Sequence, residues 1–144
     1  MKFLFFLLST FYSTVTFGQS ENKTFLRFDG FYETTCYFDE GDDEGSQDYL
    51  RFYANGKVIS VGTDCEGTAD ELKSWFKLDA EQVSTTNYKF TGRRIFFSTK
   101  SKSGIVKYKG RLNKNGILKL KWKSSINGKR GHEQYKFIQI AGLT

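Results

Sequence analysis

The sequence predicts an all-β protein, a single antiparallel up-and-down β-barrel of about eight strands, with one short α-helix between strands 3 and 4. Aromatic and β-branched segments of six to nine residues alternate with clusters of Gly, Asn, Ser and Asp, a spacing typical of antiparallel barrels and sandwiches. The 144 residues suit one domain, and 15 Phe, 8 Tyr and 2 Trp can supply its core. The chain also contains no Pro, which would interrupt a central strand.

The N-terminus is typical of a secretory signal peptide. Lys2 is followed by an apolar stretch from Phe3 to Phe17, and small residues come next. The alternative is a membrane anchor, but this stretch is diluted with Ser and Thr and is shorter than the roughly 20 residues that a span needs. We therefore predict a signal peptide over 1–18, a barrel domain over 19–144, export to the periplasm or beyond the cell, and no span in the mature chain.

The strands are expected between the turn-forming clusters of the mature chain. Their predicted ranges are 25–38, 48–54, 57–63, 87–92, 94–100, 105–112, 117–123 and 132–140.

Between the third and fourth strands, Thr68 and Glu71 form a capping box. Leu72, Trp75 and Phe76 follow at the spacing of one helix face. We expect this helix to end near 77–79 and to cover an open end of the barrel, either as a core plug or as a lid over a ligand cavity.

The cysteines, Cys36 and Cys65, are the only two in the chain. In an oxidising compartment an even pair predicts one disulfide, and two buried free thiols are the alternative. The bridge would close a loop of about 30 residues and contribute roughly 3–4 kcal/mol in the chain-entropy model. Two Cys and a single His exclude a zinc finger and a multi-histidine metal site.

Two hairpins allow the strand register to be predicted. Asn55-Gly56 suits a two-residue type I′ turn. That turn would pair Ala54 with Lys57, Phe52 with Ile59 and Leu50 with Val61.

The second hairpin is better explained by a three-residue loop with Gly116 in the left-handed conformation, because this keeps its apolar face whole. The loop pairs Asn113 with Ile117, Leu112 with Leu118, Gly110 with Leu120 and Tyr108 with Trp122.

The apolar faces of these hairpins predict one interior. An eight-stranded barrel is either filled by side chains or holds one small ligand. The candidate ligand-binding residues in the barrel interior are Leu50, Phe52, Ile59, Val61, Tyr108, Leu120 and Trp122. A small apolar molecule is the expected ligand of this site.

Charge is segregated along the chain. Residues 29–81 hold 14 acids and 4 bases, whereas 93–144 hold 14 bases and one acid, Glu133, within a net charge of +6. The second hairpin places its bases opposite one another, which is destabilising unless an anionic surface or protein partner compensates. The alternative is that solvated lysines protect the sheet from edge pairing. Nucleic acid is not expected, because few aromatic residues interleave with the bases. The basic surface comprises Lys107, Lys109, Arg111, Lys119, Lys121 and Lys123.

Catalytic and metal-binding patterns are sparse. His132 is the only candidate general base of its type, and no G-x-S-x-G motif accompanies it, so we expect a protein that is not an enzyme. The segment 39–48 carries six carboxylates that could bind Ca²⁺, but their spacing departs from the EF-hand pattern. We expect a mobile, solvated connection there, no cofactor, no metal ion and a monomer.

Several short segments carry a family resemblance. Gly30 lies on the first strand with an aromatic residue, Tyr32, two positions later, as in the Gly-x-Trp motif of lipocalins. With the eight-strand meander and the segments 49–61, 68–76 and 125–128, the chain resembles lipocalin-like (calycin) barrels, in particular small exported bacterial members. The resemblance implies the barrel fold and a small apolar ligand inside it. The chain departs from the family in having Tyr in place of Trp and a helix that precedes the fourth strand rather than following the last.

Overall fold

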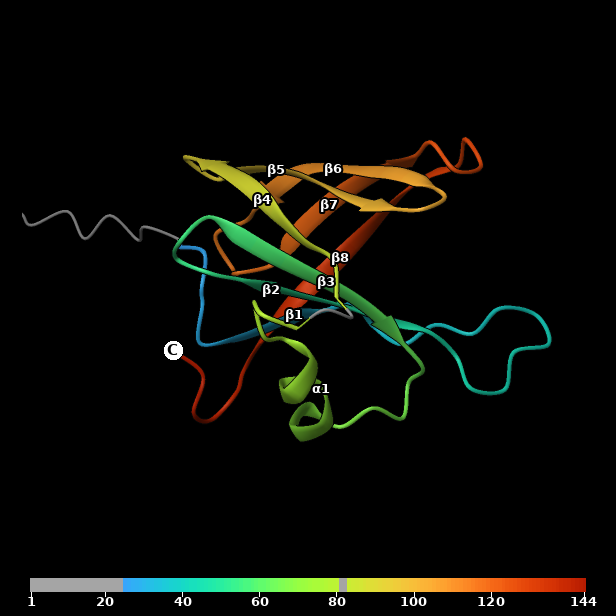
Figure 1. Cartoon of the computed structure of the whole chain (residues 1–144), viewed down its shortest axis with the longest axis horizontal. Helices are drawn as coiled ribbons and strands as arrows, with labels where there is room; N and C mark the ends of the chain where they lie inside the picture. Colours follow the sequence, from blue (N-terminus) through green and yellow to red (C-terminus); the bar gives the residue numbers. More distant parts are fainter. Residues whose placement is uncertain (1–24, 81–82) are drawn as a thin grey trace, which may run out of the picture.

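The computed structural model of the chain describes residues 25–80 and 83–144. The predicted signal peptide lies outside these residues. The described chain forms a closed barrel in which each strand pairs with its neighbour in sequence and the last strand pairs with the first, all antiparallel (Figure 1). The predicted fold class is therefore confirmed, including one short helix between the third and fourth strands.

The elements follow the expected order with some shorter bounds. The first strand is much shorter than the predicted range 25–38, because the chain leaves the barrel after Glu33. The elements are β1 (Gly30–Glu33), β2 (Gln47–Phe52), β3 (Lys57–Thr63), α1 (Ala69–Trp75), β4 (Thr85–Thr91), β5 (Arg94–Ser101), β6 (Gly104–Leu112), β7 (Leu118–Ser124) and β8 (Arg130–Gln139). No helix among the described residues combines the length and the apolar character that crossing a membrane requires.

The barrel interior is packed with aromatic and aliphatic side chains. The ring of Phe52 is completely buried and meets the rings of Tyr32, Tyr88 and Phe97 edge-on, with centroids 5.5, 5.1 and 6.0 Å away. Phe97 also stacks on Tyr108 at 4.6 Å. The other buried members of this cluster are Leu26, Leu50, Val58, Ile95, Leu112, Leu118, Leu120 and Tyr135. These side chains form one continuous core inside the barrel.

Helix α1 packs against the outer wall of the barrel and does not close one of its ends (Figure 1). Leu72 and Phe76 lie in a second core, and the ring of Phe76 contacts that of Phe31 on β1 at 4.4 Å. The predicted plug or lid is therefore wrong. Trp75 is 47% exposed and does not belong to the buried stripe, which is a second correction.

The ends of the helix are held by polar contacts. The capping box between Thr68 and Glu71 is confirmed, with each residue accepting a backbone N–H of the other. At the other end, the Phe76 carbonyl accepts hydrogen bonds from the Arg51 guanidinium at 2.9 Å and the Tyr53 hydroxyl at 2.6 Å. Arg51 therefore fastens the helix to β2 from the outside of the barrel.

The predicted register of the β2–β3 hairpin is wrong by one residue. The loop has three residues, and the Tyr53 N–H bonds the Lys57 carbonyl at 2.9 Å. Only Gly56 is left-handed, with φ +82°, whereas the predicted type I′ turn needs positive φ at Asn55 as well. Phe52 consequently pairs with Val58, Arg51 with Ile59, Leu50 with Ser60 and Tyr49 with Val61.

This shift moves two predicted ligand-binding residues out of the barrel. Ile59 and Val61 lie on the outer wall and belong to the core beneath α1, together with Phe31, Tyr49, Leu72, Phe76 and Ile140. Their assignment to the interior site is therefore corrected. Both faces of β2 and β3 carry apolar side chains. A shift of the pairing by one residue turns the other apolar face toward the barrel interior, so the apolar pattern alone does not determine the register.

The β6–β7 hairpin has the predicted register throughout. Asn113 donates its N–H to Ile117, and Gly116 is left-handed with φ +77°. Leu112 pairs with Leu118, Gly110 with Leu120, Tyr108 with Trp122, Arg111 with Lys119, Lys109 with Lys121 and Lys107 with Lys123.

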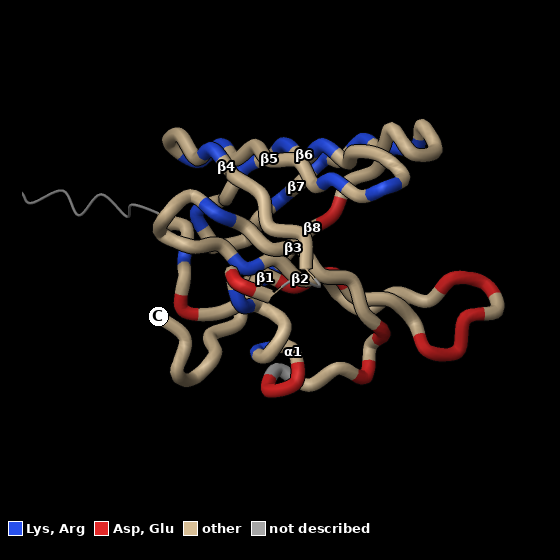
Figure 2. The backbone as a smooth tube through the Cα atoms, viewed as in Figure 1, with Lys and Arg blue, Asp and Glu red and all other residues tan. Residues whose placement is uncertain are grey.

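The predicted disulfide is also confirmed. Cys36 and Cys65 are bonded, with Cα atoms 5.6 Å apart. The bridge ties the connection between β1 and β2 to the chain that follows β3, and the Cys65 N–H bonds the Glu44 carbonyl at 3.2 Å. The acidic segment is thereby anchored beside the barrel, and the part of it that precedes β2 loops away from strands β4–β8 (Figure 2).

Candidate functional site

The outer face of strands β4–β8 is strongly basic. Side chains alternate along each strand, and the charged set falls on the face opposite the barrel core. Lys and Arg follow these strands, whereas Asp and Glu gather on the acidic segment and around α1 (Figure 2). The exposed bases of this outer face include Lys89, Arg94, Lys107, Lys109, Arg111, Lys119, Lys121, Lys123 and Arg130.

No carboxylate on these strands neutralises the basic face. Glu133 is the only acid in residues 93–144, and it lies opposite Leu120, on the inward side of β8. There it accepts hydrogen bonds from the Trp122 indole and the Tyr135 hydroxyl, both at 2.9 Å. Among the described residues, the single ion pair joins Arg27 to Asp29, on the chain before β1. Lys136 on β8 faces Glu33 of β1, but no described carboxylate forms an ion pair with a base that lines the groove.

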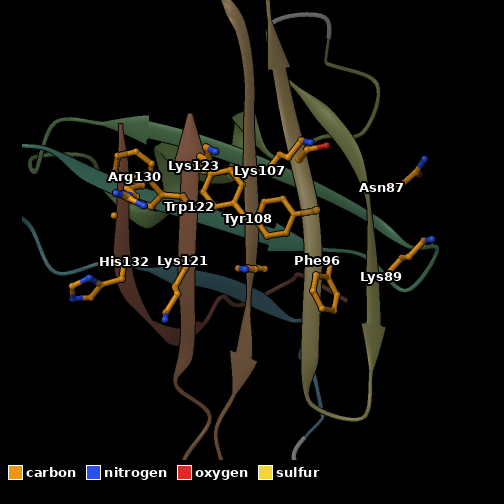
Figure 3. Close-up of a pocket in the computed structure, with 14 residues that line it drawn as sticks. Asn87, Lys89, Phe96, Lys107, Tyr108, Lys121, Trp122, Lys123, Arg130 and His132 are labelled. Atoms are coloured by element: carbon orange, nitrogen blue, oxygen red, sulfur yellow. The ribbon is translucent and has the colours of Figure 1, made fainter. Parts of the chain in front are cut away.

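A groove of about 970 Å³ runs along this face between two rows of side chains (Figure 3). Each row crosses the strands, because its members are paired in register from β5 to β8, and Lys89 of β4 pairs with Phe96. One row consists of Lys89, Phe96, Lys109, Lys121 and His132. The other consists of Asn87, Ser98, Lys107, Lys123 and Arg130. We refer to these two rows and the space between them as the groove.

The floor of the groove is formed by the residues between the rows. Phe97, Tyr108, Trp122 and Gly131 line it and occupy inward-facing positions of their strands. The Trp122 ring packs on Gly131 so closely that an added Cβ there would lie 2.7 Å from it. Because Gly131 has no side chain, the indole of Trp122 can pack against its backbone and donate its N–H to Glu133.

Sheet geometry sets the dimensions of the groove. Residues two apart on one strand are separated by about 7 Å, which is the spacing of the two rows. Adjacent strands are about 4.8 Å apart, so the rows extend over about 19 Å from β4 to β8. The third basic row, Arg94, Arg111 and Lys119, lies on the same face but does not line the groove.

The structure brings the predicted basic residues together on one outer face, whereas it keeps only some of the predicted ligand-binding residues inside the barrel. Lys107, Lys109, Lys121 and Lys123 line the groove, and Arg111 and Lys119 flank it. Inside the barrel, Leu50, Phe52, Tyr108 and Leu120 pack against one another in the filled core, with Trp122 at its edge.

Sequence reasoning missed the contribution of β4, β5 and the start of β8. Lys89, Phe96 and Arg130 complete the rows, and two-residue loops at 92–93 and 102–103 set the registers of Lys89 and Phe96. The alternation of Lys89 with Tyr88 and Phe90 was the available signal, since it places Lys89 outside. His132, the sequence's only histidine, stands at the end of one row beside Lys121 and not beside an acid that would orient it as a base.

A pair of carboxylates lies inside the barrel beneath the basic face. Asp48 belongs to β2, on the inward side with Leu50, and is therefore not part of a solvated loop as its position in the acidic segment suggested. Burial, with a smaller contribution from the charge of Glu133, raises the pKa of Asp48 to about 6. Within residues 25–80 and 83–144, no three His, Cys, Asp or Glu side chains are grouped as metal ligands would be.

Comparison with known proteins assigns no family to the chain. No protein-family model matches the sequence, and no curated protein is similar to it. The barrel itself is compatible with a lipocalin-like fold, since it has eight antiparallel strands in up-and-down order.

Proposed function

We propose that this protein is an exported, non-enzymatic interaction protein that binds a polyanionic partner through the groove on β4–β8. The observation that carries the proposal is the set of exposed, unneutralised bases on one face of the barrel. Three like-charged pairs face each other across β6 and β7, Lys107 with Lys123, Lys109 with Lys121 and Arg111 with Lys119. Such pairs cost stability in the free protein, and an anionic ligand would remove that cost.

Electrostatics favour a polymer over a small anion. An array of bases on one rigid sheet contacts several charges of one chain at once, and each contact releases counterions from the polymer. A single small anion would gain only one or two exposed charge pairs, each worth about 0.2–1 kcal/mol.

The other functions predicted for the chain have less support. The apolar ligand implied by the lipocalin-like resemblance would have to displace the rings around Phe52, which already pack against one another. An enzyme would require a constellation around His132 or the carboxylates, and Glu133 is occupied by Trp122 and Tyr135. We retain a distant relationship to the lipocalin-like barrels as part of the proposal, supported by the strand order.

Export is supported by two features. The Cys36–Cys65 bond needs an oxidising compartment, and the N-terminal sequence has the pattern of a signal peptide. In the cell envelope or outside it, acidic polysaccharides and anionic surface polymers are available as partners for a basic face.

Charge removal from the groove tests this function. We expect the triple variant Lys107→Gln, Lys109→Gln, Lys121→Gln to bind heparin roughly tenfold more weakly than the wild type, at about 0.5 kcal/mol for each lost charge pair. The slope of log affinity against log salt should become shallower by about two to three units. Calorimetric titration at several salt concentrations measures both quantities.

The matched control removes three exposed lysines away from the groove, as Lys77→Gln, Lys102→Gln, Lys114→Gln, and changes the net charge equally. Its affinity should stay within about twofold of the wild type if local contacts decide binding. Equal losses in both triple variants, or a wild type with no salt-dependent binding, would contradict the proposal.

A further inference from the structure

We infer that the groove takes a single chain of a linear acidic polysaccharide, which lies across the strands between the two rows of side chains. This inference rests on the proposed function and specifies its ligand. The rows place bases on both sides of one channel, with Lys109 and Lys121 on one side and Lys107 and Lys123 on the other (Figure 3). A chain in the channel would meet cations on both of its edges.

The close spacing of the two rows favours a narrow partner. The Cα atoms of the two rows are about 7 Å apart, which is the length of two residues along a strand. A nucleic-acid duplex, whose major groove alone is about 12 Å wide, cannot lie between them. A flat anionic membrane would touch only the tips of the rows and leave the floor without a contact.

The lining favours sugars over single-stranded nucleic acid. Single-stranded nucleic acid is bound by aromatic rings on which successive bases stack. Of the aromatic residues that line the groove, Tyr108 and Trp122 occupy inward-facing positions, and Trp122 is held by its bond to Glu133. Phe96 is 46% exposed and offers one apolar surface to the face of a sugar ring.

Polar groups on the rim complete the match to a hydroxylated polymer. Asn87 and Ser98 stand in the row with Lys107 and can exchange hydrogen bonds with sugar hydroxyls. An acidic peptide fits less well, because a peptide bound by strand addition runs along a sheet edge, whereas this groove crosses the strands.

The first part of the test is a length series. Heparin oligosaccharides of defined size are titrated into the wild-type protein at constant salt. Affinity per chain should rise with length until the chain spans the roughly 19 Å between β4 and β8, and it should then level off. An affinity that keeps rising steeply with length beyond this span would overturn the single-groove assignment.

The second part compares two double variants on the same two strands and the same face. Lys109→Gln with Lys121→Gln removes charges that line the groove, and Arg111→Gln with Lys119→Gln removes charges of the third basic row. The groove variant should lose about fivefold in affinity for an oligosaccharide that fills the groove, and the flanking variant less than about twofold. Phe96→Ala should weaken binding without changing the salt slope, because it removes no charge.

The outcomes separate this inference from the function on which it rests. Salt-dependent binding with equal losses in the two double variants would overturn the groove and leave the basic face as a diffuse polyanion site. Tighter binding of a single-stranded DNA of equal charge, or of anionic vesicles, would overturn the polysaccharide assignment. A wild type that binds none of these probes would overturn both proposals.

Discussion

Replacing Phe52 with Ala is expected to lower the free energy of unfolding by about 4 kcal/mol. The ring is completely buried, and it contacts the rings of Tyr32, Tyr88 and Phe97. These neighbours come from three different strands, so no single shift can close the space that the mutation leaves. Urea denaturation of the wild type and the variant, followed by tryptophan fluorescence, measures the difference.

Phe38→Ala is the control for this change, because it removes the same atoms from a side chain that is 62% exposed. Its effect should stay within about 0.5 kcal/mol. If Phe52→Ala cost no more than the control, the interior would not be packed as described, and an apolar ligand in the barrel would become the better explanation. The folded Phe52 variant should still bind a polyanion, since Phe52 does not line the groove.

Asp48→Asn is expected to stabilise the protein at pH 7 by about 2 kcal/mol, after allowing for residual solvent contact of the carboxylate. Burial raises the pKa of Asp48 from its ordinary value of 3.8 to about 6 in the folded protein. Between these two values the folded chain holds a proton that the unfolded chain has lost. The contribution of Asp48 to stability is therefore greatest below pH 4, falls as the pH rises, and is constant above about pH 6.

The side-chain amide of the Asp48→Asn variant does not titrate, so this pH dependence of the unfolding free energy is lost. The difference in unfolding free energy between variant and wild type should be small at pH 4, grow through pH 5 and level off above pH 6. Denaturation across this range measures the difference directly, and Asp43→Asn in the exposed acidic segment is the control. A variant that is less stable than the wild type at pH 7 would mean that the charged carboxylate of Asp48 has a favourable partner inside the barrel.

The two hairpins show why one strand register could be predicted from the sequence and the other could not. The β6–β7 register was predictable because only one face of these strands is apolar, and a slip of one residue would bury lysines. The β2–β3 register was not, because α1 covers the outer wall of those strands and makes both faces apolar. The turn sequence alone could not decide, since Gly56 serves a two-residue or a three-residue loop.

The same long-range packing explains the other differences. A capping box and an apolar spacing indicate where a helix forms, but not which surface receives it. The pattern therefore located α1 correctly and misplaced it relative to the barrel. Likewise, the lysines of β6 and β7 were visible in the sequence. The groove was not, because it also needs Lys89, Phe96 and Arg130, which come from three further strands and join the rows only when all five strands pair in register.

The most direct test of the central claim is a map of the backbone amide signals that move when a heparin oligosaccharide is added to the whole mature protein. We predict that the largest shifts fall on β5–β8, at residues such as Lys109, Lys121 and Gly131. The outer wall beneath α1 should stay unchanged. Shifts concentrated around α1 or inside the barrel at Leu50 would contradict the assignment of binding to the basic outer face.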